Sequence, residues 1–316
     1  MSISHRNILL FCLKLLVTAG CLWWLSRYVD LKSIFVSLDG FSVPVILVGI
    51  VLHTASYLAG SLRWWILFRH LAGAVSFGQI LPSYYLGVFF NNMFPSAYGG
   101  DVARSARLFV SGMSGSALVG SAVVDRLLGL AAVISLGGLA LLFTDIQALG
   151  VHTRTVFLGG AATLLLALWA ILFFDWNGII HSRYGRRWPR LHAVLSCFEV
   201  YRRAPWLILQ AFLLSLVNQL LVLIVYVLLA REAGVVVPVT QLVAILMVVF
   251  LIASLPISLG GLGPREGALM ALLTLLGVEP SAVLALSIAY LLVLWSSALP
   301  GLFMLFVRPE RPPENV

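Results

Sequence analysis

The sequence contains few charged residues and few cysteines for its length. Only 10% of its 316 residues are Asp, Glu, Lys or Arg, whereas about a quarter of a soluble globular domain is charged. The three cysteines show no paired spacing, so the sequence predicts neither a disulfide framework nor a cysteine-based metal site. A Walker-type phosphate-binding loop is also missing. We therefore expect no ATP hydrolysis by this chain and no bound cofactor.

The sequence also lacks the residue patterns that catalysis commonly requires. It has no closely spaced pair of acids, no cluster of His and Cys ligands, and no nucleophile beside a general base. We therefore expect a protein that is not an enzyme. Two alternatives remain open. One is an integral-membrane transferase, in which Asp101, Asp125 or Glu266 binds a metal or acts as a base. The other is an accessory subunit of a membrane glycosyltransferase.

Hydrophobic residues make up most of what is present. They account for 61% of the chain, and the mean hydropathy is +1.04. Six apolar runs can each supply the roughly 20 residues that cross a hydrocarbon core: residues 8–26, 43–62, 115–143, 155–174, 205–230 and 281–307. Strands of a membrane barrel would instead be about 10 residues long with alternating polarity. The pattern predicts an all-α, polytopic helical membrane protein that forms a single transmembrane domain over residues 1–316.

Positive charge is concentrated in one loop. The formal net charge is +8, and the loop 175–204 contains six arginines, which are Arg183, Arg186, Arg187, Arg190, Arg202 and Arg203. An excess of Lys and Arg is typical of cytoplasmic loops, so we interpret it as an orientation signal, with contacts to anionic headgroups as the alternative. The loop and both termini are then cytoplasmic, and residues 144–154 and 231–238 are external. No nucleic-acid partner is expected.

The two halves of the chain share a spaced motif. In each half a proline is followed by glycines at offsets of 4 and 5 residues and by an arginine at an offset of 9. The first set is Pro95, Gly99, Gly100 and Arg104, and the second is Pro256, Gly260, Gly261 and Arg265. The same shift of 161 residues places the apolar run 43–62 on 204–223 and 115–143 on 276–304. Counted from the cytoplasmic loop, the halves have opposite orientations, which predicts a first inverted repeat over 43–143 and a second over 204–307.

Each repeat is predicted to contain a re-entrant hairpin, in addition to the roughly six spanning helices expected from the apolar runs. Residues 77–110 must begin and end on the cytoplasmic side, and residues 239–277 on the external side. The helices are expected to break at a set of hinge residues: Pro95, Gly99, Gly100, Pro256, Gly260, Gly261 and Gly263. Backbone that leaves a helix at membrane depth needs partners from protein or from a watery cavity. The glycines permit tight conformations with positive φ.

Arginines near the restarting helices suggest an anion site. Arg104 and Arg265 follow the two breaks, where free N–H groups and the helix dipole already favour negative charge. We predict that they converge near mid-depth on a substrate phosphate, while Asp101 and Glu266 offset their charge at rest. In the alternative, Asp101 caps its helix or pairs with Arg104, and Glu266 complements the helix dipole.

Two ionisable residues lie inside a spanning run. Asp125 and Arg126 would each cost about 2.5–3.5 kcal/mol at the bilayer centre, so they must face the interior or pair. Neighbouring residues on a helix point about 100° apart, and the two therefore need different partners. They are predicted to belong to the substrate site, with a purely structural salt bridge as the alternative.

Other polar residues also interrupt apolar segments. Asn91 and Asn92 precede the first break and are predicted to line the substrate cavity. Arg63 lies beside two tryptophans and is interpreted as an interfacial anchor. Interhelical hydrogen bonding is the usual reason for amides and imidazoles in such runs, and it is the interpretation chosen for His53, Asn218 and Gln219.

Three motifs in order resemble one known family. NNMFPSAYGGDVARSARL, SAVVDRLLGL and SLPISLGGLGPREGALMALL are together similar to the membrane flippase domain of the lysylphosphatidylglycerol synthases. The resemblance implies a domain that moves a lipid between the leaflets of the bacterial cytoplasmic (inner) membrane. In bifunctional members a soluble aminoacyl-transferase domain follows the membrane part. This chain stops at Val316, so we expect no aminoacyl transfer from it.

The resemblance and the arginines together favour a lipid flippase or transporter. Its expected partner is a membrane lipid that carries phosphate, and both an anionic phospholipid and a polyprenyl-phosphate-linked sugar fit. The inverted repeat favours transport over the transferase and accessory-subunit alternatives, because alternating access uses that symmetry and chemistry does not need it. Association with a membrane glycosyltransferase or another envelope-synthesis enzyme stays open as a second kind of partner.

Overall fold

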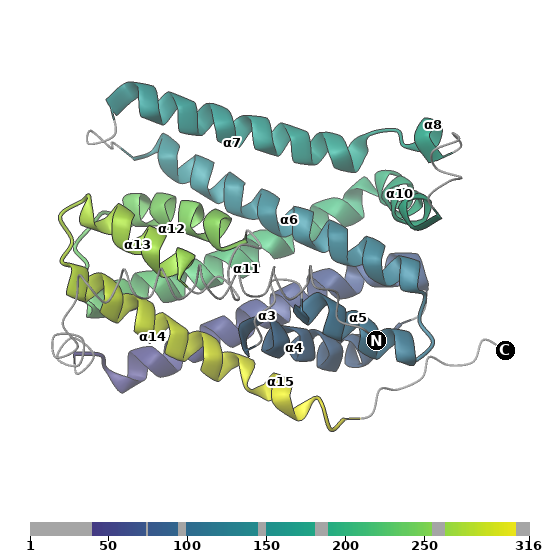
Figure 1. Ribbon diagram of the computed structural model, residues 1–316, viewed down its shortest axis with the longest axis horizontal. Coiled ribbons are helices and arrows are strands. Elements are labelled where there is room, and N and C mark those ends of the chain that lie inside the picture. Colours follow the sequence, from purple (N-terminus) through teal and green to yellow (C-terminus); the bar gives the residue numbers. More distant parts are fainter. Residues whose placement is uncertain are drawn as a thin grey trace, which may run out of the picture.

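The computed structural model describes residues 40–73, 75–93, 99–144, 150–180, 189–254 and 263–307. Within these ranges the regular elements are helices, and the prediction of an all-α, polytopic helical fold is confirmed. In chain order (Figure 1) they are α3 (Val43–Ala72), α4 (Phe77–Met93), α5 (Gly99–Val110), α6 (Gly115–Leu142), α7 (Gly150–Phe173), α8 (Asn177–Ile180), α10 (Pro189–Arg202), α11 (Pro205–Glu232), α12 (Val239–Ser254), α13 (Pro264–Thr274), α14 (Pro280–Ala298) and α15 (Pro300–Phe303).

Four helical stretches of the described chain are long and apolar enough to cross a membrane. They are Val43–Ala72, Gly115–Leu142, Pro205–Glu232 and Pro280–Phe303. Each overlaps a predicted spanning run, and the shorter apolar helix Leu158–Phe173 overlaps a fifth. The first predicted run, 8–26, lies outside the described residues.

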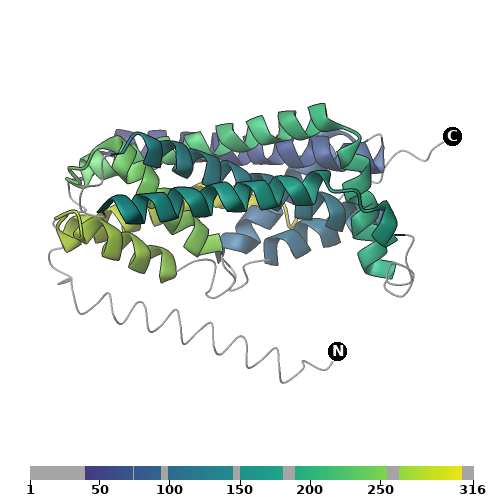
Figure 2. The ribbon, with the colours of Figure 1, turned by 90° about the horizontal axis from the view of Figure 1, so that it is seen from above.

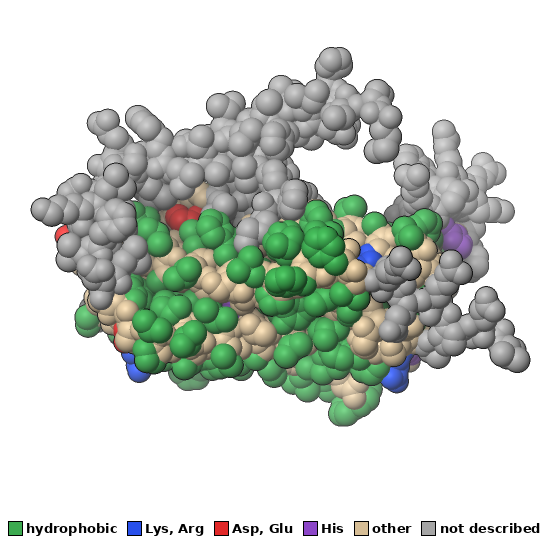
Figure 3. Space-filling model, turned by 90° about the horizontal axis from the view of Figure 1, so that it is seen from below, with side chains coloured by type: hydrophobic (Ala, Val, Ile, Leu, Met, Phe, Trp, Pro, Cys, Tyr) green, Lys and Arg blue, Asp and Glu red, His purple; other side chains and the backbone are tan. Residues whose placement is uncertain are grey.

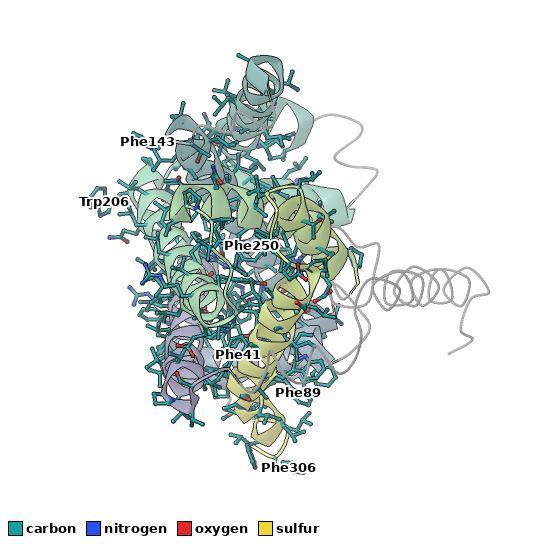
Figure 4. All side chains as sticks on the ribbon, turned by 90° about the vertical axis from the view of Figure 1, so that its left-hand side faces the viewer. Phe41, Phe89, Phe143, Trp206, Phe250 and Phe306 are labelled. Carbon is teal, nitrogen blue, oxygen red and sulfur yellow. The ribbon has the colours of Figure 1, made fainter. Side chains whose placement is uncertain are left out.

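The outer surface is strongly apolar. Figure 3 shows hydrophobic side chains covering much of the described part of one face, with basic side chains near its ends. In Figure 4, Phe143, Trp206 and Phe306 lie at the edge of the bundle, and all three are largely exposed. A contiguous apolar surface of this kind is unfavourable in water and matches a lipid environment.

Helices α3 and α11 form the centre of the bundle. They pack against each other and cross the middle of the molecule, and each also packs against both α6 and α14. One buried cluster joins α11, α12, α13 and α14 through side chains such as Val225, Leu246, Leu273 and Leu286. Helix α7 lies on the outside, where it packs on α6 and α10 (Figure 2).

The contacts between helices are preserved when the two halves are exchanged. Exchange replaces α3 by α11, α4 by α12, α5 by α13, and α6 by α14. The pair α6–α12 then becomes α14–α4, α6–α11 becomes α14–α3, and α5–α6 becomes α13–α14, and every one of these pairs is in contact. An internal repeat over residues 43–143 and 204–307 would produce this pattern. The opposite orientation of the repeats in a membrane stays a prediction.

Two short helices pack together in each predicted hairpin, α4 with α5 and α12 with α13. The segments that join them, including Pro95, Pro256, Gly260 and Gly261, lie outside the described residues. Gly99 is already part of α5.

Gly100 lies inside α5, next to α4. The sequence permits positive φ at this glycine, but its backbone is helical, without positive φ. A Cβ on Gly100 would lie 2.0 Å from the backbone oxygen of Gly87 on α4. The residue is therefore a glycine because two helices approach each other closely here.

Candidate functional site

Five charged side chains meet inside the first half of the bundle. Asp125 of α6 accepts a hydrogen bond from Arg63 Nε of α3 at 2.6 Å and one from Arg104 of α5 at 3.2 Å. Asp101 of α5 pairs with Arg104 at 2.9 Å and with Arg126 of α6. Arg63, Arg104 and Asp125 are buried. As ionised groups, three arginines and two aspartates leave an excess of one positive charge, which attracts an anion.

The second half contains a smaller ion pair. Arg265 donates to Glu266 Oε1, at 3.0 Å from Nε and 2.5 Å from a terminal nitrogen. Glu266 Oε2 also accepts the backbone N–H of Gly263 at 2.7 Å and so closes the first turn of α13. Gly263 has a φ of 89°, which a glycine adopts at no steric cost. This pair is buried and electrically balanced.

A polar cavity of about 340 Å³ lies between helices of the two halves. Its polar lining is His53, Ser56, Tyr57, Tyr84, Asn91, Asn92, Asn218, Gln219 and Tyr290. These residues come from α3, α4, α11 and α14, so both halves contribute to the wall. Phe250, which lies within the bundle in Figure 4, closes another part of it. Neutral hydrogen-bonding groups therefore form much of the wall of a space between apolar helices.

Each predicted arginine lies next to a tyrosine of this cavity. The guanidinium carbon of Arg104 is 5.3 Å from the ring centre of Tyr84, and that of Arg265 is 5.2 Å from the ring centre of Tyr290. Both distances are within the range of cation–π attraction. The two arginines thus approach one cavity from different helices. Their binding of a phosphate stays a prediction.

Arg104 has one donor without a hydrogen-bond partner. Its Nε is buried and makes no hydrogen bond, while its guanidinium packs 4.1 Å from the centre of the Trp64 ring. The residue borders a second cavity of about 210 Å³, shared with Tyr84, Asn91 and Arg126. An unsatisfied buried N–H costs about 1–3 kcal/mol. A bound anion that drew the guanidinium toward an acceptor oxygen would reduce that cost.

Hydrogen bonds hold the amides and the imidazole in place. Asn91 Oδ1 accepts the backbone N–H of Gly100 at 2.9 Å, and Asn92 Nδ2 donates to the Tyr57 hydroxyl at 3.2 Å. Asn218 Nδ2 donates to the Ser56 carbonyl at 2.6 Å. His53 contacts the Tyr290 hydroxyl through Nε2, at 3.0 Å. The interhelical bonds predicted for such residues are therefore present for Asn218 and His53, and both residues also border the cavity.

The interpretation of Arg63 as an interfacial anchor is wrong. The side chain is buried and ion-paired with Asp125, because α3 continues to Ala72 and carries Arg63 well inside the bundle. Asp125 and Arg126 do have different partners, as their positions on a helix require. Sequence reasoning also missed the tyrosines of the cavity. A tyrosine in an apolar run is common, and only the residues that pack around it show that it lines the cavity.

The described residues contain no group of three or more His, Cys, Asp or Glu side chains that could hold a metal ion.

Comparison with known proteins relates the chain to one family and to a membrane protein of an archaeon. The model of a family described as the lysylphosphatidylglycerol synthase TM region matches residues 11–301. A UPF0104 membrane protein of Pyrococcus horikoshii is 24% identical over 203 residues, which are 63% of this chain and 56% of that protein. The match thus spans little more than half of that relative.

Proposed function

The chain belongs to the family of lysylphosphatidylglycerol synthase transmembrane regions, and on that premise we propose that it moves a lipid between membrane leaflets. The proposed substrate carries phosphate, either as an anionic phospholipid or as a polyprenyl-phosphate-linked lipid. We further propose that the protein acts in a cytoplasmic membrane with its termini on the cytoplasmic side, and that it catalyses no covalent reaction.

The main support for the proposal is the polar cavity between the two halves. A hydrogen-bonding cavity lies inside an apolar bundle and is flanked by Arg104 and Arg265, one from each half. A lipid headgroup that crosses a membrane needs polar partners in place of water, because unsatisfied polar groups are costly in hydrocarbon. The excess positive charge near Arg104 suits a headgroup with a phosphate, and the neutral remainder of the wall suits its uncharged hydroxyl groups.

The exchangeable contacts of the two halves support transport as the activity. Secondary transporters commonly consist of two repeats, and their substrate site lies at the repeat interface. Here the polar cavity takes residues from α3 and α4 of one half and from α11 and α14 of the other. Opening toward either leaflet then requires only that the halves exchange their local arrangements.

Reconstituted vesicles test the proposal. The purified chain is inserted into vesicles with a fluorescent phosphatidylglycerol or a fluorescent polyprenyl phosphate, and an impermeant reductant then bleaches the outer leaflet. We expect more than half of the label to become accessible in protein-containing vesicles and about half in empty ones. For a fluorescent neutral glycolipid, the bleached fraction of the label should stay near half in both kinds of vesicle. Equal bleaching of the phosphate-bearing lipids with and without protein would overturn the proposal.

A further inference from the structure

An apolar groove lies between α5 and α6, on the outer side of the charged cluster. It has a volume of about 470 Å³. Val102, Ala106 and Phe109 of α5 and Val119 of α6 are among its lining residues, and all four are exposed. The groove therefore opens on the surface that faces lipid when the bundle is in a membrane.

The groove ends at the ion pair between Asp101 and Arg126. Both residues line the groove, and both also line the 210 Å³ cavity that Arg104 borders. That cavity in turn shares Tyr84, Val88 and Asn91 with the large polar cavity. The groove, the smaller cavity and the polar cavity are thus neighbours that share wall residues, and the ion pair lies between the first two.

The charges at this junction fit the phosphate of a lipid. Asp101 and Arg126 are the charged members of an otherwise largely apolar lining. The Arg126 side chain is 38% exposed, so a ligand can reach it from the groove. A phosphate offers the same kind of acceptor oxygens as the Asp101 carboxylate and can replace it on the planar guanidinium. Asp101 would keep its pairing with Arg104 after such an exchange.

We propose that the α5–α6 groove is the lateral entrance for a lipid, whose hydrocarbon chain lies along the groove while its phosphate exchanges with Asp101 on Arg126. The occupant follows from the position of the groove. Its apolar walls face the membrane, and the end formed by Asp101 and Arg126 offers a cation. The inference rests on the proposed function, since it names how the lipid reaches the central cavity.

Quenching by brominated chains tests the proposal in dodecyl maltoside micelles, which contain no phosphate. A cysteine replaces Ala106, after the three native cysteines are replaced by serine, and carries a bimane fluorophore. Dibrominated phosphatidylglycerol and dibrominated diacylglycerol have the same quenching chains and differ in the phosphoglycerol headgroup, which carries the only charge of the pair. The matched control is the same label at Leu166, which is 71% exposed on α7.

We expect phosphatidylglycerol to half-quench position 106 at a lipid-to-protein ratio at least threefold below that of diacylglycerol. At position 166 the two lipids should be equivalent. Arg126→Gln should abolish the difference at position 106, and Asp101→Asn should increase it, because the competing carboxylate is gone. Equal quenching by both lipids at position 106 would overturn the proposal, as would an undiminished difference in Arg126→Gln.

A transport measurement separates this proposal from the proposed function. Ala106→Trp fills the groove at an exposed position, and Leu166→Trp is its control on α7. We expect at least a fivefold slower lipid movement for Ala106→Trp and an unchanged rate for Leu166→Trp. If Ala106→Trp moves lipid at the wild-type rate, the entrance lies elsewhere and the transport function stands. If the wild-type chain moves no lipid, the transport function falls, whatever the groove binds.

Discussion

At the scale of single residues, Arg104 joins the charged cluster to the aromatic side chains around it. It pairs with two aspartates, packs on two aromatic rings, and keeps a buried Nε without a hydrogen bond. A residue whose role is only structural would ordinarily satisfy all its donors. Arg104 also borders the 210 Å³ cavity, and Arg265 holds the corresponding position beside Tyr290.

The first prediction compares lysine and alanine at the two arginines. Arg104→Lys and Arg265→Lys keep the charge but lose the planar fork, so each should slow lipid movement in vesicles while the protein level stays normal. Arg104→Ala and Arg265→Ala should abolish it, by 100-fold or more if one bidentate, charge-assisted contact of about 3 kcal/mol is lost. If both alanine variants move lipid at the wild-type rate, the arginines are structural.

The second prediction concerns Asp125. Asp125 accepts hydrogen bonds from both Arg63 and Arg104. Asp125→Asn removes the negative charge that balances these two buried arginines, so it should lower the free energy of unfolding by about 3–5 kcal/mol. Asp175→Asn is the control, since that side chain is 61% exposed and its Arg202 partner lies 3.7 Å away; its effect should be under about 1 kcal/mol. Thermal unfolding in detergent measures both. Normal stability with lost transport would assign Asp125 to the substrate instead.

The sequence identifies some of these residues and not others, for physical reasons. Asp101, Arg104 and Asp125 stand out because charge is expensive in an apolar segment. Arg63 looks like an anchor because it adjoins Trp64 and Trp65, and sequence alone does not show that α3 continues for another two turns. The cavity tyrosines are neutral and amphipathic, so their role depends on what packs beside them.

At the scale of helices, close packing depends on small residues. Gly100 of α5 meets both Gly87 and Asn91 of α4, and its backbone N–H reaches Asn91 Oδ1. This contact holds α5 against α4, and it thereby fixes the positions of Asp101 and Arg104 relative to the cavity. The sequence shows the repeated glycines, but it does not determine their backbone conformation.

The third prediction tests this contact with alanine. In Gly100→Ala the new Cβ would lie 2.0 Å from the Gly87 oxygen and 2.4 Å from Asn91 Cγ, so α5 must move away. Overpacking of this kind costs about 1–3 kcal/mol, and it should lower both the melting temperature and the transport rate. Gly159→Ala on α7 meets no atom within 4 Å and should leave both unchanged. A fully stable and active Gly100→Ala would contradict the close packing.

The fourth prediction uses Glu199 of α10, in the loop predicted to be cytoplasmic. Arg202 donates to Glu199 at 2.7 Å and 3.0 Å, and these hydrogen bonds are the main cause that lowers the pKa of Glu199 from 4.5 to about 2. A lowered pKa adds stability above about pH 4.5 that is lost as the pH falls toward 2. The melting temperature of wild type should therefore exceed that of Glu199→Gln at pH 7, and the gap should narrow at pH 3. A gap that is constant with pH would contradict the ion pairing.

At the scale of the whole molecule, orientation in the membrane is the main open prediction. The described helices agree with the apolar runs, because length and hydropathy are properties of the sequence itself. The spaced motif of proline, glycines and arginine also shows where the two predicted repeats lie in the sequence. The contacts of α6 with α12 and of α4 with α14 could not be predicted from the sequence. Contacts between distant segments follow from packing and leave no local pattern.

The fifth prediction tests orientation with two single cysteines in a cysteine-free chain. Val236→Cys lies at a 92% exposed position after α11, and Gly178→Cys lies in α8 with open space around it. The arginine asymmetry places the first outside and the second in the cytoplasm. An impermeant maleimide should label Val236→Cys in intact cells and Gly178→Cys only after permeabilisation. The reverse result would invert the whole topology.

The exchangeable contacts of the two halves also bear on the conformational equilibrium that the proposed transport requires. The helix contacts are similar when the halves are exchanged, but the charges are not. Among the described residues, the cluster of one half holds three arginines and two aspartates, and that of the other holds Arg265 and Glu266. Under the proposed transport function, we infer two conformations related by this exchange, which would be similar in apolar burial and would differ in electrostatic energy. A bound anion would reduce the energy difference by cancelling the excess positive charge.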